Sequence, residues 1–144
     1  MTLEKLKIIN TILLLVYFSY EDIRYRKIST YLLLIGYVIA VIYLIAAREL
    51  ALWEYLAGGC VGVLFLFLSI GGEGIGIGDS ILIMLLGMLL GVRRQISVLF
   101  IGVLLCAVTA AVLFAAGKVG KKSKLPFVPF LLAAYCALLC GRYI

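Results

Sequence analysis

Histidine is absent from this sequence of 144 residues, and aspartate occurs only at Asp22 and Asp79. Without histidine, the chain cannot use Ser-His or Cys-His catalysis, histidine metal ligands or histidine proton relays. The four cysteines form no CxxC pair, so neither a zinc site nor a disulfide framework is indicated. We therefore expect no bound metal and no cofactor.

Charge is also scarce, because charged residues make up 14% of the chain and hydrophobic residues 66%. Soluble domains contain about 25% charged and about 45–50% apolar residues. The composition predicts an integral membrane protein with a single domain over residues 1–144. The net charge of +6 requires no nucleic-acid partner, since the basic residues gather in short loops where membrane proteins retain them.

Six apolar segments are candidates for membrane spans, since a span takes about 20 apolar residues, with a range of about 17–25. The sequence therefore predicts an all-α, polytopic membrane protein, a bundle of six transmembrane helices. The fourth segment is short, and it can be accommodated by a thinned bilayer or by a start inside a protein-lined cavity. The predicted spans are residues 5–21, 31–47, 52–70, 79–92, 96–117 and 126–143. In the third span, Gly58, Gly59 and Gly62 indicate close helix packing.

The distribution of basic residues predicts the orientation of these spans. The loops at 21–30 and 117–124 carry seven basic residues between them, against six on the opposite side. The density of the 117–124 loop favours placing its side in the cytoplasm, with both termini outside. In this topology Asp22 ends the first span and Asp79 opens the fourth, so both aspartates lie near the cytoplasmic face.

The stretch GGEGIGIGD, residues 71–79, combines a flexible loop with an acid at the start of a span. Glycine lets such a loop bend and lets another chain approach closely. Nucleotide binding is disfavoured, because no strand precedes the loop and no lysine stands where a phosphate site needs one. An ionisable group at membrane depth indicates a functional site. Asp79 could instead be an N-cap of the fourth helix, and Asp22 could be a solvated acid beside Arg24 or Arg26.

Two aspartates at one membrane face suit a particular chemistry. Two carboxylates within a few Å cannot both ionise easily, so one of them holds a proton near neutral pH. In an aspartic protease, the ionised member takes a proton from the attacking water, and the protonated member donates to the carbonyl oxygen of the peptide. The same pair could carry protons or cations in a small transporter or proton-coupled channel, and this alternative stays open.

Three motifs make the chain resemble the type IV prepilin peptidases, a family of GxGD intramembrane aspartyl proteases. Residues 76–79, GIGD, match the GxGD signature; residues 22–28, DIRYRKI, resemble the first-aspartate motif; and residues 126–130, PFVPF, resemble the proline–phenylalanine motif that opens the last helix. Three positions depart from the family pattern. Ile81 stands where a lysine is common, and Ser29-Thr30 where Pro-Asn is common.

The resemblance implies an intramembrane aspartic endopeptidase of the cell (cytoplasmic) membrane. It would cut the leader peptide from prepilin-like precursors of the type IV or Flp type, at the cytoplasmic face and in contact with membrane lipids. Longer members carry paired CxxC motifs and methylate the product, so this chain is expected to lack methyltransferase activity. A non-catalytic pilus-assembly scaffold is the further alternative. The residues implied are Asp22 and Asp79 as catalytic, and Gly76, Gly78, Pro126, Phe127 and Pro129 as positioning residues. Apart from the resemblance, the position of Glu73 and Glu21 beside the two aspartates suggests the hypothesis that they bind a basic leader.

Overall fold

The computed structural model describes residues 3–46, 51–71, 76–118 and 125–143, with side chains described as far as residue 141. These residues form six α-helices and no strand, which confirms the predicted all-α class. The helices are α1 (Leu3–Tyr25), α2 (Thr30–Ala46), α3 (Leu52–Gly71), α4 (Ile77–Leu90), α5 (Val92–Ala115) and α6 (Val128–Tyr143). Each of them overlaps one of the predicted spans.

The predicted boundaries differ most at the start of α5 and at the end of α1. Helix α1 continues to Tyr25, so Asp22 lies in its last turn. The sequence had suggested that Asp22 lies in a loop. The amide of Arg26 still donates to the carbonyl of Asp22, over 3.1 Å. Arg26 then turns into the left-handed region, with φ of 51°, which is a common way to end a helix. The charged residues after Glu21 therefore extend the helix beyond its apolar part.

Helix α4 is at the centre of the molecule. A helix that is apolar on all sides is normally buried, and α2, α3 and α5 all pack against α4. Leu15 and Phe18 of α1, together with Val128 and Leu131 of α6, belong to the same core, and α1 also packs on α6. The buried residues of α4 are Ser80, Leu82, Ile83, Leu85, Leu86, Gly87, Leu89 and Leu90.

The contact between α3 and α4 is close, as predicted from the glycines of the third span. A Cβ at Gly58 would lie 2.6 Å from the carbonyl oxygen of Gly87, and a Cβ at Gly62 would overlap the backbone of Met84. Both glycines are therefore required for the observed helix separation. Gly59 is different, because a Cβ there would meet only the Cγ of Met88 at 3.9 Å.

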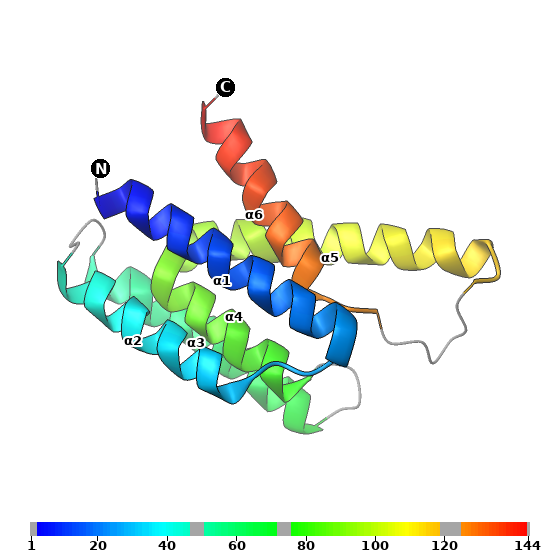
Figure 1. Cartoon of the computed structure of the whole chain (residues 1–144), viewed down its shortest axis with the longest axis horizontal. Helices are drawn as coiled ribbons and strands as arrows, with labels where there is room; N and C mark the ends of the chain where they lie inside the picture. The colour runs from blue at the N-terminus through cyan, green and yellow to red at the C-terminus, as the bar shows by residue number, and fades with distance from the viewer. Residues whose placement is uncertain (1–2, 47–50, 72–75, 119–124, 144) are drawn as a thin grey trace.

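The outer surface of the bundle is largely apolar. Large exposed apolar side chains occur along α1, α2, α3 and α5, and the second half of α5 extends beyond the other helices (Figure 1). Two of the described helices, α3 and α5, are long and apolar enough to cross a membrane, with only 22% and 17% of their apolar windows buried; α2, α4 and α6 are apolar but shorter. Such exposure is typical of a surface covered by another apolar phase. The bundle of six spans stays a prediction.

Polar contacts distinguish the two ends of the bundle. The starts of α1, α3 and α5 meet at one end, where Arg93 lies 3.9 Å from Glu54 and Arg94 lies 3.9 Å from Glu4. At the same end, the buried Lys7 donates to the hydroxyl of Tyr55 over 3.5 Å. The last turn of α1 and the start of α6 meet at the other end. The candidate site lies there.

Candidate active site

Asp22 is a buried acid that joins two helices distant in the sequence. Its side chain is only 7% exposed, and its Oδ2 accepts a hydrogen bond of 3.0 Å from the backbone amide of Val128. Val128 is the first residue of α6, and the first amides of a helix have no partner within the helix. Asp22 therefore caps α6 from α1, and its negative charge faces the positive end of the α6 dipole.

Asp79 is the third residue of α4 and is half-buried. It is not the N-cap, because Gly76 holds that position and no side chain makes a capping bond there. The interpretation of Asp79 as an N-cap is therefore wrong. Gly76 instead leaves space for the acid, since a Cβ at Gly76 would lie 3.3 Å from Oδ2 of Asp79. The first turn is closed by Ser80, whose amide and hydroxyl both donate to the carbonyl of Gly76, over 3.1 and 3.3 Å.

The segment between α1 and α2 brings the two aspartates to the same end of the bundle. Ile28 packs against the start of α4, where a Cβ at Gly78 would lie 3.3 Å from the Cβ of Ile28. The segment that follows Asp22 is thus in contact with the residue before Asp79. The two aspartates therefore lie at the same end of the bundle. A glycine at position 78 permits this approach because any side chain would meet Ile28.

The proline–phenylalanine segment lies at the same end but begins α6 differently from the prediction. Pro126 precedes the helix and is not in its first turn, which corrects the predicted boundary at residue 126. Phe127 packs against the core, and its carbonyl accepts the amides of Phe130 and Leu131. Pro129 is in the first turn, where the missing N–H costs nothing. Sequence reasoning missed the Val128 amide, since a backbone donor leaves no signal in the side-chain pattern.

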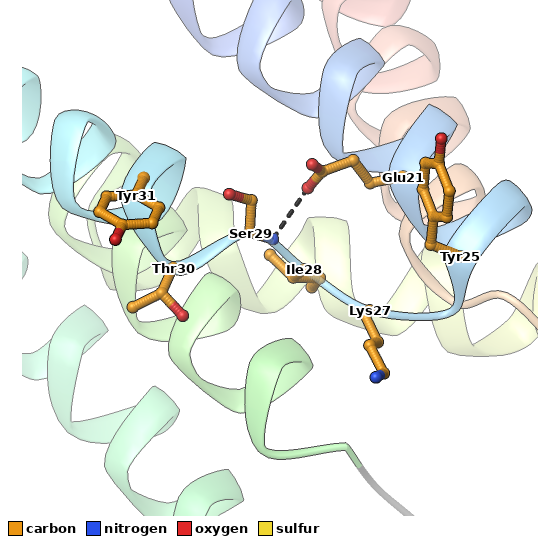
Figure 2. Close-up of a pocket in the computed structure, with 7 residues that line it drawn as sticks. All are labelled: Glu21, Tyr25, Lys27, Ile28, Ser29, Thr30 and Tyr31. Atoms are coloured by element: carbon orange, nitrogen blue, oxygen red, sulfur yellow. Dashed lines mark hydrogen bonds between the residues drawn. The ribbon is translucent and has the colours of Figure 1, made fainter.

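A cleft of about 430 Å³ lies at the segment that joins α1 to α2. Glu21 forms part of its wall, and its Oε2 accepts a 2.8 Å hydrogen bond from the amide of Ser29. Figure 2 shows that the Lys27 side chain points away from Glu21. Neither aspartate is among its lining residues, but Glu21 precedes Asp22 in the chain and Ile28 contacts Gly78. Its lining residues are Glu21, Tyr25, Lys27, Ile28, Ser29, Thr30 and Tyr31.

Two further predictions concern Glu73 and a bound metal. Glu73, suggested as an acid for a basic leader, lies outside the described residues. Within the part of the chain that the structure describes, no cluster of three or more His, Cys, Asp or Glu side chains could hold a metal ion. The carboxyl groups described at this end of the bundle are those of Glu21, Asp22 and Asp79.

Comparison with known proteins gives one match. A family model described as the type IV leader peptidase family matches residues 9–111. The matched range includes both aspartates, α2, α3, α4 and most of α1 and α5. A search of curated proteins found no match, and a search of solved structures found none either.

Proposed function

The chain belongs to the type IV leader peptidase family, and from this premise we propose that it is an aspartic endopeptidase acting within the membrane. It would remove the leader peptide of prepilin-like precursors at the cytoplasmic face, without methylating the product. The observation that carries the proposal is the position of Asp22 and Asp79. Both fall inside the family match, and both lie at the end of the bundle where Ile28, from the segment after α1, contacts Gly78 at the start of α4.

In the proposed reaction, a water molecule between the two carboxyl groups attacks the scissile carbonyl carbon. The ionised carboxylate takes a proton from this water, while the protonated carboxyl donates its proton to the carbonyl oxygen. The carboxyl that gained the water proton then gives it to the amide nitrogen, and the other carboxylate takes a proton from a hydroxyl of the diol. The C–N bond breaks to release the amine and a carboxylic acid, and both carboxyl groups return to their starting states. Asp22 suits the ionised role because its Oδ2 already accepts the Val128 amide. Asp79 then suits the protonated role.

The substrate would reach the pair from the cleft. Its leader segment would lie along the cleft lined by Tyr25, Ser29 and Tyr31, and the apolar helix that follows would remain in the membrane. This arrangement presents the peptide bond between leader and helix to the aspartates. The attraction of a basic leader by Glu21 and Glu73 stays a prediction. The Glu21 carboxylate already accepts a hydrogen bond from the Ser29 amide.

Cleavage by aspartate variants tests the proposal. We expect Asp22→Asn and Asp79→Asn each to lower leader removal by about 100-fold or more, since positioned acid–base groups contribute about 10²–10⁴ in rate. The protein would be co-expressed in membranes with type IV and Flp-type prepilins, and leader removal followed by mass. Glu4→Gln is the matched control, because Glu4 lies at the opposite end of the bundle, near Arg94.

The outcomes separate clearly. Processing by the parent and by Glu4→Gln, but by neither aspartate variant, would support the dyad. Processing that survives either Asp→Asn substitution would rule out the two-carboxylate mechanism. Each variant must be present in the membrane at the parent level, which an immunoblot of the membrane fraction checks.

A further inference from the structure

Two polar side chains bond the main chain of α4 from neighbouring helices. The hydroxyl of Tyr37, on α2, donates to the carbonyl of Ile81 over 3.0 Å. The Nε2 of Gln95, on α5, donates to the carbonyl of Ile83 over 2.7 Å. Both carbonyls follow Asp79 within about one turn of the same helix. Otherwise α4 is surrounded mainly by apolar side chains.

The two donors approach α4 from nearly opposite directions. Successive residues of an α-helix are about 100° apart around the axis, so positions 81 and 83 are about 200° apart. A bond on each side resists both rotation of α4 and sliding along its axis. Apolar packing alone has no such directional preference. The constraint on Ile83 also acts on the backbone of Asp79, because in an α-helix the amide of Ile83 donates to the carbonyl of Asp79.

Gln95 is costly for the core that contains it. Its side chain is only 1% exposed, and its Oε1 has no hydrogen-bond partner among the described residues. A buried unpaired oxygen lowers stability, and polar residues at membrane depth are generally functional. Gly87 leaves the space that this amide needs, since a Cβ there would lie 2.8 Å from the Oε1 of Gln95. Packing alone would be better served by an apolar side chain of similar size.

We propose that Tyr37 and Gln95 are positioning residues that fix the rotation of α4 and thereby hold the Asp79 carboxyl toward Asp22. This inference rests on the proposed function, because it concerns the geometry of the same pair. The first turn of α4 needs such support. Its amides lack the helical partners of later turns, and Ile28 is the neighbour that contacts Gly78 from outside α4.

The test compares two pairs of matched variants. Tyr37→Phe and Gln95→Met remove the two donors to α4 and keep the side-chain size. Tyr43→Phe and Asn10→Leu are the controls, because Asn10 donates to the Tyr43 hydroxyl over 2.8 Å and this bond joins α1 to α2. We expect kcat to fall about 10-fold in each α4 variant with KM within about twofold, since misplaced reacting groups cost rate and not binding. The controls should keep the parent kcat.

A second readout does not depend on cleavage. Asp22→Cys and Asp79→Cys would be combined after replacing the four native cysteines, and the rate of disulfide formation measured under mild oxidation. Tyr37→Phe and Gln95→Met should slow this crosslink at least threefold relative to Tyr43→Phe and Asn10→Leu. Thermal unfolding in detergent monitors stability in all variants.

The two readouts distinguish the possible failures. Unchanged kcat and crosslinking, or equal losses in the control variants, would overturn the positioning role. If the parent cleaves no prepilin but the crosslink still slows only in the α4 variants, the positioning holds and the proposed peptidase function is the part at fault.

Discussion

Asp22 combines two tasks in one side chain. Its carboxylate caps α6 through the Val128 amide, and it is one of the two proposed catalytic groups. The cap orders the start of the last helix, so the start of α6 and the proposed carboxyl pair depend on the same side chain. A residue with both roles needs variants that separate them.

Replacing Asp22 by asparagine or alanine makes this separation. Asparagine keeps an oxygen that can accept the Val128 amide, whereas alanine leaves that amide without its partner. Both remove the charge, so their difference reports the cap alone. We expect Asp22→Ala to have a free energy of unfolding lower than that of Asp22→Asn by about 0.5–2 kcal/mol, as for other N-caps. Denaturant unfolding in detergent micelles measures it, and equal stability would show that the bond contributes nothing.

At the scale of the element, the position of α4 depends on glycines of the neighbouring helix α3. Gly58 and Gly62 of α3 bring the two backbones together, and Gly87 of α4 faces Gly58. Gly87 also leaves space on α4 for the side-chain amide of Gln95. The α3–α4 contact and the α5 contact to α4 are therefore coupled through one residue without a side chain.

Adding one methyl group at two neighbouring glycines tests the closeness of the helices. We expect Gly58→Ala to lower the free energy of unfolding by about 1–3 kcal/mol, the usual cost of overpacking, because its Cβ would lie 2.6 Å from a backbone oxygen of α4. Gly59→Ala is the control in the next position, with space for its Cβ. It should be neutral or slightly stabilising. Equal effects at both positions would contradict the packing described for α3 and α4.

At the scale of the whole molecule, the polar groups divide between two ends. Glu4, Glu54 and Arg93 mark one end, while Asp22 and Asp79 mark the other. Between them, exposed apolar side chains cover four of the helices. This division is the arrangement expected of a protein that crosses a bilayer with its polar ends in contact with water.

Accessibility of single cysteines tests the predicted topology. Lys27→Cys and Arg93→Cys would be made in a background without native cysteines, since both positions are exposed. With a reagent that does not cross membranes, Lys27→Cys should react only from the cytoplasmic side and Arg93→Cys only from the outer side. Sealed vesicles of both orientations provide the comparison. Labelling of both positions from one side would contradict the six-span topology.

The sequence by itself determined the helical class, the approximate extent of every helix and the two acids that merit attention. Each of these depends on local properties: the length of an apolar run, the rarity of aspartate, and motifs of a few residues. Local reasoning was less reliable at helix ends, where it placed residues 22–25 in a loop and left open an N-cap role for Asp79. There, side-chain type competes with neighbours that the sequence does not reveal.

Only the tertiary structure decided what surrounds the two acids. The Val128 amide reaches Asp22 across 106 positions of sequence, and the donors on α4 come from two other helices. None of these partners has a distinctive pattern, because a backbone amide, a tyrosine or a glutamine occurs in many settings. Their roles arise from the way the six helices pack together, with α2, α3 and α5 against α4. Packing is a collective property of the whole chain, whereas helix formation in an apolar run is a property of the run itself.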